Sequence, residues 1–228
     1  KKRKSYKRRR KRYSRRSNPR LSVGGFPNSR LAKLTYAQEV VLNPGAGTFA
    51  ENTFRLNSIY DCDQTGVGHQ PMNRDIFATI YGHYTVLGAQ IKATYVGNGT
   101  ATSVVPVYFG LIMDDTAAGT TPYTSVTDVF ENKNASRVTW RQAGVYMNSA
   151  PNKQVICKQN FSAKKFFGLS KPQDGAAYGA NIGSNPSKGA YSTLWSTGVN
   201  GTDGGNCVFL VQLTYIVLFD QLLQQDQN

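Results

Sequence analysis

The chain has 228 residues, of which 39% are hydrophobic, and it carries 27 Lys and Arg residues against 13 Asp and Glu residues. The formal net charge of +14 is typical of a protein that binds nucleic acid. The length suits one large all-β domain or two small ones, and we favour one because no low-complexity linker divides the chain. The most apolar run, 207–219, is too short and too rich in β-forming residues for a membrane helix, so we expect no membrane insertion.

The first 20 residues, KKRKSYKRRRKRYSRRSNPR, form a basic arm that holds 13 of the basic residues and no acidic one. Subtracting the arm leaves 14 basic and 13 acidic residues in 21–228, a charge near +1. A block of like charge repels itself and buries little apolar surface, so we expect the arm to be disordered when free. We predict that it binds nucleic acid through Lys1, Lys2, Arg3, Lys4, Tyr6, Lys7, Arg8, Arg9, Arg10, Lys11, Arg12, Tyr13, Arg15, Arg16 and Arg20.

A plain alternative for the arm is a solvated tail or a nuclear import signal alone. Thirteen cations exceed what a short import signal needs, and the same residues can also serve host nuclear import receptors. Tyr6 and Tyr13 stand among the cations, where their rings can stack on unpaired bases while their neighbours hold phosphates. We therefore divide the chain into residues 1–29, the arm with a Gly- and Pro-containing hinge at 21–29, and residues 30–228, the body.

The body shows the two-residue period of half-buried strands. In 31–42 the residues Leu34, Tyr36, Val40 and Leu42 share one face, and the polar residues between them share the other. The segment 84–97 follows the same rule, with Leu87, Ala89, Ile91, Ala93 and Tyr95 predicted on the buried face. In 207–219 every odd position is apolar, which predicts a central strand.

Five further segments complete the predicted set of eight strands: 51–58, 104–114, 136–142, 153–160 and 190–197. Short turns rich in Gly, Asn and Pro at 43–48, 97–103, 143–152 and 198–205 alternate with long connections at 59–83, 115–135 and 161–189. This alternation predicts an all-β fold, a jelly roll of two packed antiparallel sheets. Residues 75–81 predict a short helix with Asp75 as its N-cap.

The segment 60–75 holds the one cluster that suggests chemistry, with Asp61, Cys62, Asp63 and His69 close in sequence. It lacks metal-ligand spacing and a nucleophile with its base, so we interpret it as a structured turn, in which Gly66 and Gly68 permit positive φ.

Other residues that could carry chemistry have plainer structural explanations. His83 is expected to pack or to form a hydrogen bond, and Trp140 and Trp195 to pack in the core or at an interface. The three cysteines, Cys62, Cys157 and Cys207, are expected to be buried thiols from a reducing compartment. We predict no enzyme activity, no cofactor and no metal.

Two blocks in the middle of the chain carry a resemblance to a known family. They are Thr65 to Met72, TGVGHQPM, followed by Tyr81 to Gly88, YGHYTVLG, and Ile91. Together with the basic start, VPVYFGLIMDD at 105–115 and NCVFLVQLTYIVLFD at 206–220, they resemble the capsid proteins of circovirus-like viruses, which have circular single-stranded DNA genomes that encode a Rep protein. Asn73-Arg74 departs from the Gly and aromatic residue that many relatives have there.

The resemblance implies a viral jelly roll that assembles as a homo-oligomer, of 60 copies in the simplest icosahedral shell, with the arm turned inward onto a single-stranded DNA genome. It also implies a place in the virion and, during assembly, in the host nucleus. Two alternatives stay open: the capsid protein of a small RNA virus, and a cellular nucleic-acid-binding β-sandwich protein with an import signal. The first shares both the arm and the jelly roll, and the second should remain a monomer or a small oligomer.

Overall fold

The protein is a sandwich of two antiparallel sheets, seen in a computed structural model that describes residues 25–98, 106–116, 125–131, 138–143 and 154–223. One sheet has the strand order β1-β9-β3-β6, with the short β7 paired to β3, and the other has the order β2-β8-β4-β5. Consecutive strands mostly pass from one sheet to the other, as in a jelly roll. The fold class predicted from the sequence is confirmed.

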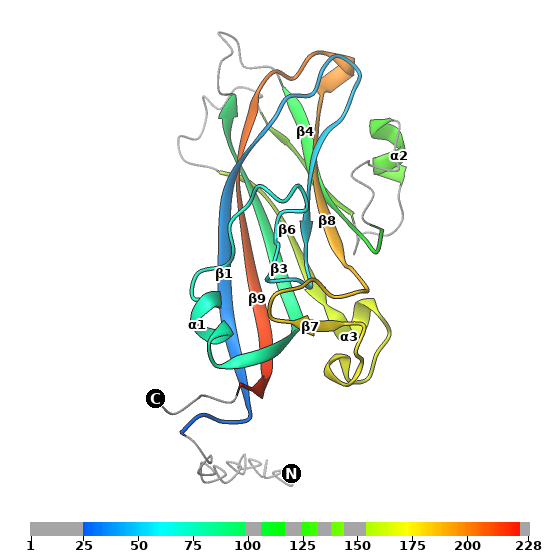
Figure 1. Ribbon diagram of the computed structural model, residues 1–228. Coiled ribbons are helices and arrows are strands. Elements are labelled where there is room, and N and C mark those ends of the chain that lie inside the picture. The colour runs from blue at the N-terminus through cyan, green and yellow to red at the C-terminus, as the bar shows by residue number, and fades with distance from the viewer. Residues whose placement is uncertain (1–24, 99–105, 117–124, 132–137, 144–153, 224–228) are drawn as a thin grey trace, which may run out of the picture.

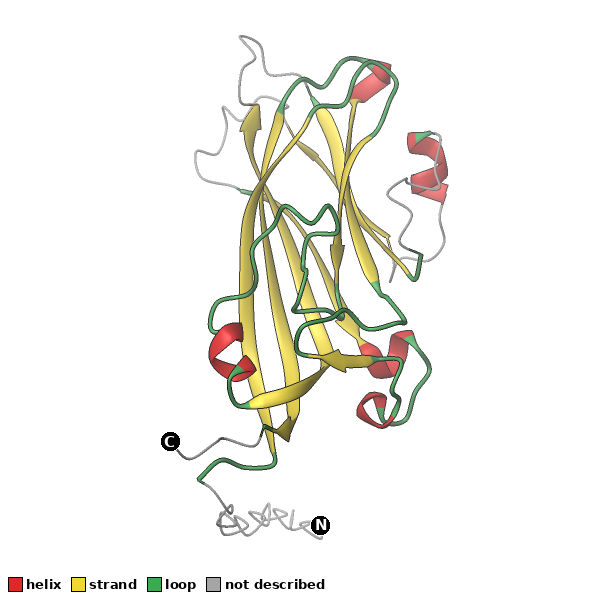
Figure 2. Ribbon diagram, in the orientation of Figure 1, coloured by secondary structure: helices red, strands yellow, loops and turns green. Residues whose placement is uncertain are grey.

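The strands form the body of the molecule, and the helices are short and peripheral (Figure 2). The strands are β1 (Ser29–Leu42), β2 (Ala50–Arg55), β3 (Tyr81–Asn98), β4 (Val107–Asp114), β5 (Val138–Ala143), β6 (Val155–Ser162), β7 (Gly179–Asn181), β8 (Tyr191–Gly198) and β9 (Cys207–Leu222). The helices are α1 (Arg74–Ala78), α2 (Val126–Glu131) and α3 (Ala163–Phe166), with 3-10 turns at Pro172–Asp174 and Val199–Gly201. No described helix is long and apolar enough to cross a membrane.

All eight predicted strands are present within a few residues of their expected bounds. The predicted strand 51–58 ends early, at Arg55, because the chain then turns away; Asn57 instead binds the 188–190 segment through its side chain. The ninth strand, β7, was not predicted, since three residues are too few to show a period.

The core lies between the sheets, and β9 supplies its centre. The odd residues from Cys207 to Phe219 are all buried, and β9 pairs with β1 on one side and with β3 on the other. The predicted inward face of β1, from Leu34 to Leu42, is confirmed. Thus the alternation visible in the sequence sets which face of this sheet is buried.

Leu87 is an exception to the predicted pattern of β3. A bulge between Val86 and Gly88 leaves Leu87 without a partner on β9, so Val86 faces the core and Leu87 is only half-buried. The extra residue shifts the alternation by one, and Ala89, Ile91 and later odd residues then face inward as predicted.

Helix α1 also differs from its prediction. It begins at Arg74 after the N-cap residue Asn73, which has φ 66° and makes no side-chain cap hydrogen bond, so the prediction of Asp75 as N-cap was wrong. Asp75 lies in the first turn, where its carboxylate accepts a hydrogen bond from Arg74 Nη1 at 2.8 Å. The helix ends at Ala78, because Tyr81 already belongs to β3.

The outer side of the β2-β8-β4-β5 sheet is covered in part by α2, which packs Val129 against Trp195 and Ile112 in a second, smaller core. Trp195 is fully buried there, as predicted. Trp140 is 39% exposed and lies with its ring centroid 4.2 Å from that of Phe130 on α2. The two tryptophans therefore lie in the strands as expected but differ in exposure.

The strand ends that flank the four short connections lie at one end of the sandwich; residues 99–103 and 144–152 of the connections 97–103 and 143–152 lie outside the described residues. Asn98 is in register with Cys207, and Val107 is in register with both Gly198 and Ala143. The turns 43–48 and 198–205 touch, since Gly204 N donates to the carbonyl of Pro44 at 3.0 Å. The termini of the described chain lie at the opposite end, with α1 and α3 (Figure 1).

Candidate nucleic-acid interface

The predicted nucleic-acid-binding residues, from Lys1 to Arg20, all lie outside the described part of the chain. The structure does describe the last part of the hinge, residues 25–29, which we call the arm root. The described chain therefore begins at the end of the sandwich opposite the turns 43–48 and 198–205 (Figure 1).

The arm root is anchored by β3 and β9. Tyr81 Oη donates to the carbonyl of Pro27 at 2.9 Å, and Tyr81 is only 2% exposed. Its ring lies 6.1 Å from that of Phe219, which also stacks on Phe77 with a centroid distance of 4.6 Å. Ser29 then pairs with Asp220 as the first residue of β1. The arm thus extends from a packed aromatic cluster at a defined end of the body.

Beside the arm root, His83 forms the hydrogen bond that the sequence led us to expect. His83 Nδ1 lies 2.7 Å from Asp220 Oδ1, which links β3 to β9. Strand β7 pairs with β3 beside His83. A Cβ added to Gly179 of β7 would lie 2.6 Å from His83 Cε1. A glycine is required on β7 because the imidazole occupies the space of a side chain.

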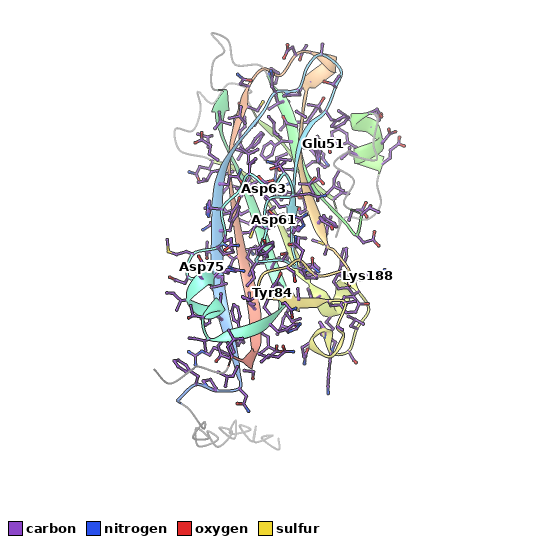
Figure 3. All side chains as sticks on the ribbon, in the orientation of Figure 1. Glu51, Asp61, Asp63, Asp75, Tyr84 and Lys188 are labelled. Atoms are coloured by element: carbon purple, nitrogen blue, oxygen red, sulfur yellow. The ribbon has the colours of Figure 1, made fainter. Side chains whose placement is uncertain are left out.

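The segment 60–75 is a structured turn, as predicted. Asp61 pairs with Arg55, and Asp63 Oδ1 accepts hydrogen bonds from the backbone N–H of Thr65 at 3.0 Å and from its hydroxyl at 2.8 Å. Figure 3 shows Asp61 and Asp63 near the middle of the molecule. These carboxylates therefore stabilise local structure, and each already has a partner.

His69 and the two glycines complete this turn. The imidazole lies against two carbonyl oxygens, with Nδ1 2.8 Å from that of Gln70 and Nε2 2.9 Å from that of Ala37. Gly66 has the predicted positive φ, 76°. Gly68 does not have a positive φ; a Cβ there would lie 2.6 Å from Tyr36 Oη, and close packing explains the glycine.

Buried polar side chains hold the long connections together at the end that carries the arm root. Asn57 donates through Nδ2 to the carbonyl of Lys188 at 2.7 Å and accepts from Ala190 N at 2.9 Å. Tyr84 Oη donates to the carbonyl of Ser184 at 2.9 Å; Tyr84 and Lys188 are labelled in Figure 3. Arg74 Nη2 also donates to the carbonyl of Ile182, and Ile182 N donates to the carbonyl of Gly82, so the loops 59–83 and 161–189 are fixed to each other and this end of the body is a defined surface.

The three cysteines are buried free thiols, as expected. Burial raises the pKa of Cys62 and of Cys157 to about 12, so both are protonated near neutral pH and neither can act as a thiolate nucleophile there. In the described ranges, no three His, Cys, Asp or Glu side chains are grouped so that they could hold a metal ion.

No protein-family model matches the chain, and no curated protein matches it. Among solved structures, it is similar to that of Desmodium yellow mottle tymovirus, with 13% identity over 99% of this chain and 100% of the other and a TM-score of 0.43. It is also similar to the capsid protein of BFDV in a 60-mer, with 14% identity, coverages of 89% and 100% and a TM-score of 0.41. A third is Mud crab tombus-like virus, with 10% identity, coverages of 93% and 96% and a TM-score of 0.47. Identities and scores this low decide neither the family nor the function of the chain.

The sequence did not reveal how the arm root is held. The contact of Tyr81 with Pro27 and the pair of His83 with Asp220 join residues more than 50 and more than 130 positions apart, and no local pattern encodes such contacts. One signal was available: the aromatic residues at 81 and 219 end predicted elements and Phe77 lies one helical turn before Tyr81, so a cluster can form once β3 and β9 pair.

Proposed function

We propose that the chain is the subunit of a viral capsid, which self-assembles into a small icosahedral shell and packages single-stranded DNA through its basic arm. One observation carries this proposal: an arm with 13 cations and no anion continues directly into a jelly roll whose own charge is near +1. Such a division separates a surface for nucleic acid from surfaces for protein contacts.

The magnitude of the arm charge suits packaging. With about 0.7 counterions released per phosphate contact, thirteen contacts would give a salt slope near −9 for single-stranded DNA. In a shell of on the order of 60 copies, the arms would bring about 780 cations into one cavity, which can neutralise a large share of a small genome. Repulsion between arms would oppose assembly until nucleic acid is present.

The geometry of the body is compatible with this role. The turns 43–48 and 198–205 and the strand ends that flank the other two short connections lie at one end of the sandwich, and the arm root lies at the other, so copies can meet at the first end while their arms extend from the second. We propose that the turns 43–48, 97–103, 143–152 and 198–205 surround a fivefold axis, and that the long loops form lateral contacts and outer relief. A particle map with these four turns away from a common axis would refute this arrangement.

The same arm fits nuclear import, so we propose that the protein enters the host nucleus for assembly and then resides in the virion. The experiment that tests the proposal deletes residues 1–20 and compares the deletion variant with the full chain. We expect the full chain to form particles that protect nucleic acid from nuclease, and the variant to fold without packaging. A deletion variant that packages DNA normally would overturn the proposal.

The RNA-virus alternative shares every structural feature above, and the nature of the nucleic acid separates the two. Nucleic acid extracted from particles should be degraded by DNase and resist RNase. The reverse result would favour the RNA-virus capsid. A cellular β-sandwich protein would bind single strands but stay a monomer or small oligomer at every concentration.

A further inference from the structure

The face of the β1-β9-β3-β6 sheet that points away from the core, which we call the outward sheet face, carries a pattern that the arm does not explain. Its side chains are those that alternate with the buried ones, and the registers place them in rows across four strands. Three of these rows are Thr35, Thr214, Gln90 and Asn160; Ala37, Gln212, Lys92 and Lys158; and Glu39, Leu210, Thr94 and Ile156. Most of these residues are exposed or half-buried.

Lys92 on β3 lies directly opposite Lys158 on β6. Residues opposite each other on antiparallel strands have Cβ atoms about 4.5–5.5 Å apart, and like charges in such a pair are destabilising. Every residue in the same row and in the two adjacent rows is uncharged except Glu39, which lies at the far edge on β1. Two cations are thus held together with no adjacent acid on this face to offset them.

The chemistry around the lysines suits a polynucleotide. Gln90 Nε2 donates to Asn160 Oδ1 at 2.8 Å, and these amides, with Gln212 and Thr214, line the centre of the face with donors and acceptors. Leu210, 48% exposed, adds an apolar surface on which a base can rest. Cations can hold phosphates, while polar groups and an apolar contact can meet unpaired bases.

The other side of the sandwich has the opposite charge in the described part of the chain. Five acidic residues lie on or beside the outer side of the β2-β8-β4-β5 sheet: Glu51, Asp114, Asp115, Asp128 and Glu131. Two cations lie on this sheet: Arg55, on the same face of β2 as Glu51, is paired with Asp61, and Arg141, on the edge strand β5, is in register with Phe109 of the inner face. A polyanion is therefore attracted to the outward sheet face and repelled from the side that carries α2.

The arm can deliver nucleic acid to this face. It continues into β1, which is an edge strand of the same sheet. From Ser29 to the row of Lys92 and Lys158 is eight residues along β1, about 27 Å at 3.3–3.4 Å per residue. An extended arm of 20 residues reaches about 66 Å, so a strand held by the arm can lie across the whole face.

We infer that the outward sheet face is a second binding surface for the single-stranded nucleic acid held by the arm, with Lys92 and Lys158 sharing one phosphate. In an assembled shell this face then looks toward the genome, and the side with α2 looks away. The inference rests on the proposed function and adds to it the orientation of the subunit and two residues outside the arm.

The test uses the full chain and oligothymidylate as the probe. The double variant Lys92→Gln/Lys158→Gln is compared with the control Lys164→Gln/Lys165→Gln, which removes the same charge from the exposed side chains of α3. Because the two lysines share one phosphate, the slope of log K against log salt becomes shallower by about 0.7 in the first variant, whereas the control keeps the slope of the unmodified chain. Unfolding in urea is expected at the same or a higher midpoint for the first variant, because a repulsive pair is removed.

A second measurement locates the contact. Lysine acylation followed by mass spectrometry should show Lys92 and Lys158 protected when oligothymidylate is bound, while Lys171 and Lys188 react equally with and without it. Equal slopes for the two variants, or equal reactivity of Lys92 with and without the probe, would overturn the outward sheet face as a binding surface. Neither result would affect the arm, whose contribution is measured separately by deletion of residues 1–20.

Discussion

Gly110 on β4 gives a sharp test of how the second sheet is packed. It is in register with Trp140 on β5 and with Trp195 on β8. A Cβ at this position would lie well inside contact distance of the carbonyl oxygen of Thr139 and 2.9 Å from Trp195 Cζ2. One obstacle is backbone of the neighbouring strand and the other is a fully buried ring, so neither can move without disturbing the sheet.

The substitution Gly110→Ala should therefore be costly. Overpacking in a filled interior destabilises by about 1–3 kcal/mol, and we expect a value near the top of this range, about 3 kcal/mol, because both neighbours are rigid. This is a large share of the 5–15 kcal/mol that typically separates folded from unfolded protein. The displaced strand would also loosen the contact of α2 with Trp195.

Urea unfolding followed by tryptophan emission measures the effect, since the chain has 2 tryptophans and one of them is fully buried beside Gly110. Gly183→Ala is the matched control: it adds the same methyl group where nothing lies within 4 Å, and should change the free energy of unfolding by less than about 0.5 kcal/mol. If Gly110→Ala were as stable as the control, with unchanged emission, the pairing of β4 with β5 and β8 would be refuted.

Three further predictions concern buried polar groups. The thiols of Cys62, Cys157 and Cys207 should react with an aromatic disulfide reagent at pH 7.5 only after denaturation, and a rapidly reacting thiol in the folded chain would contradict their burial. Burial raises the pKa of both Tyr84 and Cys62 to about 12, from ordinary values of 10.0 and 9.0. Folding therefore favours the protonated groups: the stability linked to them is complete below pH 9 and is lost as the pH rises toward 12. The urea midpoint should fall across that window, and a constant midpoint would argue against the burial of these groups. Tyr81→Phe removes the hydrogen bond to the arm root and should lower the free energy of unfolding by about 1 kcal/mol. The backbone amides of the arm root should then exchange hydrogen faster than in the unmodified chain. Equal exchange rates in the two proteins would show that this bond does not anchor the arm root.

The sequence predicts the sheets well because their alternation is local. Residues 207–219 show a two-residue period, and the pairing of β9 with β1 and β3 follows from its place at the centre of a jelly roll. The bulge at Leu87 was missed because one unpaired residue leaves no trace in composition. The N-cap of α1 was misplaced because the helix begins two residues earlier than predicted, after Asn73, which has φ 66° and makes no side-chain cap hydrogen bond.

Of the candidate interface, too, the sequence predicts only the part that depends on a local pattern. Charge density identifies the arm without any structure, since thirteen cations in 20 residues are a local property. The pair Lys92 and Lys158 becomes visible only when β3 and β6 are placed in register, because 66 positions separate the two lysines. The outward sheet face could therefore not be proposed until the strand order was known.

The most direct test of the account is electron microscopy of the purified full chain, combined with absorbance at nucleic-acid wavelengths after nuclease treatment. We predict uniform icosahedral particles that retain protected single-stranded DNA. A soluble monomer that binds single strands and forms no particles at any concentration would contradict the assignment as a capsid subunit.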